Sequence, residues 1–118
     1  MSTKMRFKLA IAAALLVALA LLAAPAVGAF KHHVTIKGNY FDGYHFKPHK
    51  ITITKGQTVH WSWNSDAKHN VTFEKLGGKH SKTKQKMDNF HVTFNKTGTF
   101  KYECTVHDFY GKVVVNAP

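Results

Sequence analysis

The sequence predicts an all-β domain, a sandwich or barrel of short strands. Short segments in which apolar and polar residues alternate recur from Phe30 to the C-terminus. Turn-forming Gly, Asn and Asp residues lie between them, as is typical of β-sandwiches. No stretch of about ten residues after Phe30 has helical periodicity.

In seven segments the apolar and polar residues alternate clearly enough to predict strands. We predict that the chain between these segments forms loops. The predicted strands are residues 33–37, 51–54, 58–63, 69–73, 90–94, 99–104 and 112–115. The predicted loops are 40–48, which is aromatic and irregular, 64–68, which is polar, and 75–89, which is rich in lysine and has room for one helical turn.

Alternation also predicts which side chains enter the core, because successive residues of a strand point to opposite faces. His69 has the same parity as Val71 and Phe73, and Cys104 has the same parity as Tyr102. We therefore expect both side chains to point inward. His60 and His91 have the opposite parity from their apolar neighbours, so we expect them to face solvent.

Residues 1–29 have the composition of a secretory signal peptide. A short basic start precedes an unbroken apolar run, residues 9–24, and small residues follow it. We expect cleavage after Ala29, with cleavage after Ala26 as the alternative, and a single domain from residue 30 to residue 118. The other interpretation is an uncleaved membrane anchor, although the run is shorter than the about 20 residues of a full span.

The expected domain is basic and holds one cysteine. From Phe30 onward it has 14 lysines, no arginine and six acidic residues. This charge favours acidic partners or an anionic cell surface, and no nucleic-acid-binding motif accompanies it. A lone thiol in an exported protein is a liability unless a metal occupies it. The alternative is a buried, inert cysteine.

That cysteine, Cys104, is followed by His107 in a Cys-x-x-His loop between two predicted strands. A thiolate and an imidazole on one tight loop can hold one side of a small transition-metal site.

Four segments together resemble the cupredoxins, the blue copper proteins, and most of all their plastocyanin, amicyanin and pseudoazurin type. They are Thr-Val-His-Trp at 58–61, Asp-Ala-Lys-His-Asn-Val at 66–71, Thr-Gly-Thr-Phe-Lys-Tyr-Glu-Cys-Thr-Val-His at 97–107, and Gly-Lys-Val at 111–113. The resemblance covers about residues 33–115. It implies a Greek-key β-sandwich of about seven to eight strands.

The resemblance also implies one copper ion per chain, cycling between Cu(II) and Cu(I). His69, Cys104 and His107 look like its ligands. Asn70 looks like the family residue that ties the two ligand loops together, with Thr105 as its partner. Two imidazoles and a thiolate form a trigonal site that suits copper.

One feature of the family is missing, the methionine that usually follows the second histidine as a weak axial ligand. Tyr110 stands where an amicyanin-like spacing would place it. Three interpretations remain open: Tyr110 ligates the copper, it covers the site without ligating, or the position holds water or a backbone carbonyl.

The remaining histidines read mainly as surface residues, including His45 and His49. His32 carries one further hypothesis. If cleavage leaves Phe30 at the N-terminus, then Phe30-Lys31-His32 could wrap Cu(II) or Ni(II) in a square plane.

The first functional hypothesis is an exported mononuclear copper protein, monomeric, that carries single electrons between redox proteins and is not an enzyme. Copper storage, delivery or detoxification is the alternative, and a metal-free binding module is the third. The sequence shows no acid–base pair, nucleophilic triad or second metal site.

Overall fold

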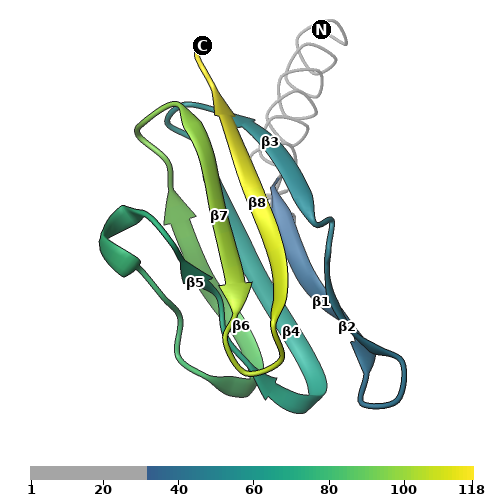
Figure 1. The fold of residues 1–118 in the computed structure, drawn as a ribbon. Coiled ribbons are helices and arrows are strands. Elements are labelled where there is room, and N and C mark those ends of the chain that lie inside the picture. Colours follow the sequence, from purple (N-terminus) through teal and green to yellow (C-terminus); the bar gives the residue numbers. More distant parts are fainter. Residues whose placement is uncertain (1–31) are drawn as a thin grey trace, which may run out of the picture.

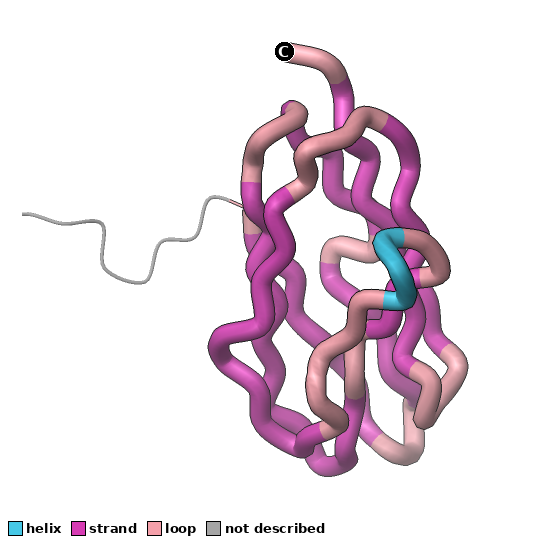
Figure 2. The backbone as a smooth tube through the Cα atoms, turned by 90° about the vertical axis from the view of Figure 1, so that its left-hand side faces the viewer, coloured by secondary structure: helices cyan, strands magenta, loops and turns pink. Residues whose placement is uncertain are grey.

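The computed structural model describes residues 32–118, which fold into two four-stranded sheets packed face to face (Figures 1 and 2). The all-β prediction is confirmed, with eight strands and a single 3₁₀ turn, η1, in this part of the chain. In chain order they are β1 (His33–Asn39), β2 (Gly43–Lys47), β3 (Lys50–Thr54), β4 (Thr58–His69), β5 (Thr72–Phe73), η1 (Leu76–Gly78), β6 (Lys84–Thr93), β7 (Gly98–Cys104) and β8 (Phe109–Asn116).

The first sheet has the strand order β2-β1-β4-β6 and the second the order β3-β8-β7-β5. Two neighbouring pairs are parallel, β1 with β4 and β3 with β8. The other pairs are antiparallel. The chain changes sheets at every connection from β2 to β7, and only the β1–β2 and β7–β8 connections stay within one sheet, as in a Greek-key sandwich.

Aromatic side chains from both sheets fill the space between them. Trp61 of β4 packs edge-to-face on Tyr102 of β7, with 5.4 Å between ring centroids, and Phe46 of β2 packs on the same tyrosine at 4.8 Å. All three are almost completely buried. Such contacts add to the free energy gained by burying the rings, so this cluster holds the two sheets in register.

Three predicted loops contain strand in the structure. Residues 64–68 continue β4, residues 43–47 form β2, and residues 84–89 are the first half of β6. The register between β4 and β6 shifts twice, between Trp61 and Trp63 and between Asn64 and His69. Such irregularities break the alternation of side chains, so the first and third of these extensions were not visible in the sequence pattern. The turn expected within 75–89 is η1.

Several chain segments meet at one end of the sandwich. β4 ends at His69, β7 ends at Cys104, and β8 begins at Phe109. The β1–β2 hairpin reaches the same end, since Tyr44 contacts His69 there. Among residues 32–118 no helix is long and apolar enough to cross a membrane. The predicted leader, residues 1–29, lies outside the described residues.

Candidate metal centre

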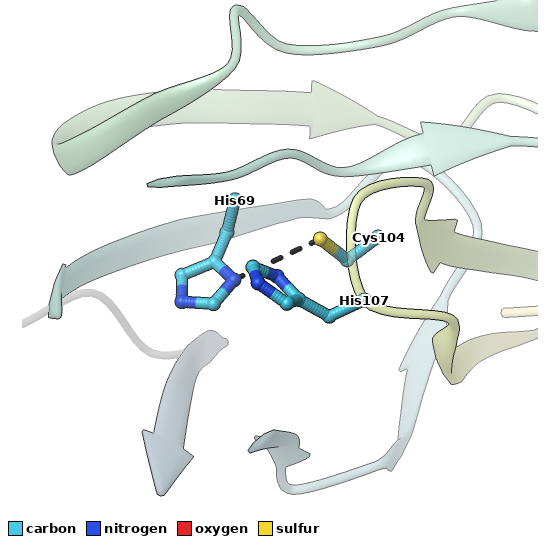
Figure 3. A group of neighbouring side chains, drawn as sticks. All are labelled: His69, Cys104 and His107. Carbon is cyan, nitrogen blue, oxygen red and sulfur yellow. Dashed lines mark hydrogen bonds between the residues drawn. The ribbon is translucent and has the colours of Figure 1, made fainter. Parts of the chain in front are cut away.

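His69, Cys104 and His107 converge at this end of the sandwich (Figure 3). Their potential ligand atoms all lie within 4.8 Å of one another. The Nδ1 atom of His69 lies 3.8 Å from the Sγ atom of Cys104. Within residues 32–118 this is the only such group of histidine, cysteine or acidic side chains.

Two of the three candidate ligands, which stand at the ends of strands, are buried. His69 and Cys104 are both 0% exposed, as their inward parity predicted. Burial, and after it the nearby His107, lowers the pKa of His69 to about 4. At neutral pH the imidazole of His69 is therefore uncharged and keeps the lone pair that a metal needs.

Ser65 orients the ring of His69. Its Oγ lies 2.8 Å from the Nε2 of His69, while the Nδ1 faces Cys104. A proton on Nε2, donated to the hydroxyl, leaves Nδ1 unprotonated and directed at the centre. Outer hydrogen bonds of this kind fix the tautomer of metal-binding histidines. Nothing in the sequence pattern singled out Ser65.

His107 joins the site from the turn between β7 and β8. The backbone N–H of Asp108 donates to the carbonyl of Cys104 at 3.0 Å and closes this turn, with Asp108 in the left-handed region at φ 52°. The imidazole is partly exposed, but its Nδ1 is buried and has no hydrogen-bond partner. A buried, unpaired ring nitrogen is costly, and a metal ion in contact with it would remove that cost.

Asn70 joins the two ligand-bearing segments. Its Nδ2 donates to the Oγ1 of Thr105 at 2.8 Å, and its Oδ1 accepts from the backbone N–H of Thr105 at 3.2 Å. The same side chain also donates to Thr83 at 3.0 Å and accepts from Thr72 at 2.9 Å. The contact between Asn70 and Thr105 expected from the resemblance is thus present, next to both His69 and Cys104 in the chain.

Two aromatic rings line the site, Phe109, which follows His107 closely in the chain, and Tyr44, which the sequence had not suggested. Tyr44 lies 4.5 Å from His69 and 4.8 Å from His107 between ring centroids. Phe109 lies 5.5 Å from His69. Tyr44 falls in the segment predicted as irregular, where no alternation indicated an inward face.

The hydroxyl of Tyr44 points away from the metal ligands. It donates to the carboxylate of Asp66 at 2.6 Å, and Asp66 also accepts from the backbone N–H of Tyr40 at 3.1 Å. The first bond is the main reason that the pKa of Tyr44 is raised to about 12 and that the pKa of Asp66 is lowered. Tyr44 therefore presents its ring, and not a phenolate, to the two histidines.

A family model described as copper binding proteins of the plastocyanin/azurin family matches residues 32–116, nearly all of the described chain. The chain is a cupredoxin. Copper is the cofactor of this family, and the buried thiol and two imidazole nitrogens form a soft, trigonal donor set that fits it.

Known cupredoxins resemble it in sequence and structure. Amicyanin from Paracoccus versutus is 37% identical over 71 residues, which are 56% of this chain and 54% of that protein. The chain therefore matches only about half the length of this relative. The crystal structure of amicyanin from the same organism has a TM-score of 0.58 at 29% identity, covering 80% of this chain and 87% of that one.

A second solved structure is a purple cupredoxin from Nitrosopumilus maritimus. It has a TM-score of 0.61 at 25% identity and covers 72% of this chain and 99% of that one.

Tyr110, the residue at the axial position by spacing, lies away from the other three in this cupredoxin. Phe109 is buried beside Cys104, its partner across β7 and β8, and Tyr110 is the next residue along the strand. Tyr110 is consequently 59% exposed and paired with Glu103, whose negative charge raises its pKa. Ligation by Tyr110 stays a prediction, and it requires a rearrangement of the first residues of β8.

The structure also locates the other histidines. His45, His49 and His80 are exposed, and His60 and His91 lie on the solvent face of the first sheet, as their parity predicted. His32 is described, but Phe30 and Lys31 are not, so the N-terminal metal site stays a prediction whose first residues lie outside the described chain.

Proposed function

We propose that this cupredoxin is an exported mononuclear copper protein that transfers single electrons between larger redox proteins. The copper ligands are the Nδ1 of His69, the Sγ of Cys104 and the Nδ1 of His107. The observation that carries the proposal is the convergence of these atoms, one of them buried without a hydrogen-bond partner.

The position of the ligands favours electron transfer over catalysis. Bound copper supplies the one-electron couple. His69 and Cys104 close two strands of a packed sandwich, and Asn70 ties them together through Thr105. Because these elements are rigid, the ligands keep one arrangement in both oxidation states, which lowers the structural cost of gaining or losing an electron. We infer that the protein is an electron carrier and not an enzyme.

The surface around His107 supports docking of a partner protein. His107 is the one proposed ligand with an exposed edge. Val106 beside it is 49% exposed, and the hairpin tip linked to the site through Asp66 presents Tyr40 and Phe41 at 77% and 93% exposure. Exposed apolar groups of this size mark interaction surfaces.

The lysines that lie near the copper site favour an acidic partner protein. Lys84 pairs with His69 across β4 and β6, and Lys86 follows it. The positive charges of these lysines, next to the copper site, would raise the rate of encounter with an acidic redox protein. Export, to the periplasm or the cell exterior, rests on the signal-peptide-like composition of residues 1–29.

Spectra and voltammetry of the mature chain loaded with Cu(II) test this function. We expect an intense thiolate-to-copper band in the visible spectrum, lost in Cys104→Ala, and a reversible one-electron wave. A spectrum that changes in Tyr110→Phe would make Tyr110 a ligand. Only weak, histidine-like absorption in the wild type would contradict the electron-carrier function.

Copper storage or delivery is the second candidate, favoured by the axial region. Apart from His107, the rings of Tyr44 and Phe109 contact His69, whereas the one methionine among residues 32–118, Met87, pairs with Trp63 on β4 and β6. Rapid transfer of Cu(I) to a chelator, without a reversible wave, would favour this candidate.

A further inference from the structure

Three histidines lie side by side across the outer face of the first sheet, far from the copper ligands. His33 of β1 is the register partner of His60 of β4, and His60 is the partner of His91 of β6. Cross-strand partners point to the same face with Cβ atoms about 5 Å apart. The three imidazoles therefore form one row over three adjacent strands.

The rings of His60 and His91 are already close to the arrangement of two ligands on one ion. Their centroids lie 5.4 Å apart with an angle of 33° between the planes. Two imidazoles that bind one metal through nitrogens at about 2.1 Å have centroids about 5 Å apart. The spacing of the two rings is therefore that of two imidazoles sharing one ion.

Neighbouring groups hold the outer rings of the row. The Nδ1 of His91 lies 3.3 Å from the backbone carbonyl of Asn89, which fits a proton on Nδ1 and a lone pair on Nε2. The Nε2 of His33 lies 2.7 Å from the hydroxyl of Ser62. Both outer rings are thus held on the face of the sheet that carries His60.

The middle ring of the row favours its neutral form. Burial lowers the pKa of His60, and His91 and His33 lower it further. At neutral pH the imidazole of His60 is therefore uncharged, and a divalent cation would replace the repulsion between imidazoles with shared coordination.

We propose that His33, His60 and His91 form a second, surface metal site for a divalent transition metal of the imidazole-binding class. Cu(II) is the ion of highest expected affinity, ahead of Zn(II), by the usual order of stabilities. His60 and His91 are the primary ligands and His33 is the third.

This site is independent of the proposed electron-transfer centre. His60 and His69 are nine residues apart on β4, which corresponds to about 25–30 Å along an extended strand. An ion on the row would sit near the opposite end of the sandwich. The proposal therefore stands or falls separately from the roles of Cys104 and His107.

Titration of the mature protein, already loaded with one copper, tests the site. A second equivalent of Cu(II) is added and followed by EPR and calorimetry. We expect a second signal with nitrogen coordination and no thiolate band. His60→Gln and His91→Gln should each weaken this second binding at least tenfold, with the visible band of the first copper unchanged.

Two control variants test whether histidines outside the row account for the second binding. His45→Gln removes an exposed histidine of the same sheet that is outside the row, and should leave the second binding intact. His32→Gln removes the imidazole of the predicted N-terminal site. The proposal is overturned if no second equivalent binds, if His60→Gln and His91→Gln leave it unchanged, or if His32→Gln alone abolishes it.

Discussion

At the residue scale, the metal centre depends on side chains that do not themselves bind metal. Asn70 is 4% exposed, and all its hydrogen bonds go to three threonines. The resemblance indicated Asn70 and Thr105, because they adjoin the proposed ligands in the chain. Ser65, Tyr44 and Asp66 carried no such signal, because their contacts come from folding.

Replacing Asn70 with alanine should loosen the link between the two ligand segments. The variant leaves the backbone N–H and hydroxyl of Thr105 without their partner, so we expect a loss of about 2–3 kcal/mol in the free energy of unfolding. Chemical denaturation measures it. Thr105→Ser keeps the hydroxyl and is the matched control. Equal stability of Asn70→Ala and the wild type would contradict the bridging role.

Two variants of Tyr44 distinguish the role of its ring from the role of its hydrogen bond to Asp66. Tyr44→Phe removes the bond to Asp66 but keeps the ring against His69 and His107, so we expect an unchanged visible spectrum and only a small loss of stability, because this hydrogen bond is exposed to solvent. Tyr44→Leu removes the ring as well and should shift the band and the potential. If Tyr44→Phe shifts them equally, the hydroxyl and not the ring governs the site.

At the scale of elements, the sequence predicted strands well where alternation is regular and failed where it is interrupted. The strand 99–104 was placed nearly as it is, within β7, because Phe100, Tyr102 and Cys104 alternate without a break. β4 was cut short at Trp63 and β6 was begun too late, since the register between them shifts twice. The interruption depends on the partner strand, which local sequence does not show.

Gly111 shows how packing between neighbouring strands constrains one residue. A Cβ atom there would lie 2.5 Å from the Cζ of Tyr102, which is fully buried among the core aromatics. Gly111→Ala should therefore lower the free energy of unfolding by about 1–3 kcal/mol through overpacking.

A double-mutant cycle tests whether the contact with Tyr102 causes this loss of stability. Tyr102→Leu removes the colliding ring, and in that background Gly111→Ala should cost much less than in the wild type. An equal cost in both backgrounds would place the cause in the backbone of β8 and not in the contact with Tyr102.

At the scale of the whole molecule, the sandwich buries a titratable ligand before any metal binds, and this makes the metal-free protein sensitive to acid. The pKa of His69 is about 4 in the folded chain and about 6.5 in an unfolded one. Between these values the unfolded chain binds more protons at this residue. The free energy of unfolding therefore rises with pH across the window, and falls as the solution is acidified from about pH 6.5 to pH 4.

The size of this effect is at most about 3.5 kcal/mol, since one pKa unit corresponds to about 1.4 kcal/mol. His60 has a lowered pKa too and contributes with the same sign, so the comparison is made in a His60→Gln background. Denaturation of the metal-free protein at pH 7, 5.5 and 4 should show the decline, and adding His69→Gln should flatten it. Equal slopes with and without His69 would show that other groups govern the acid response.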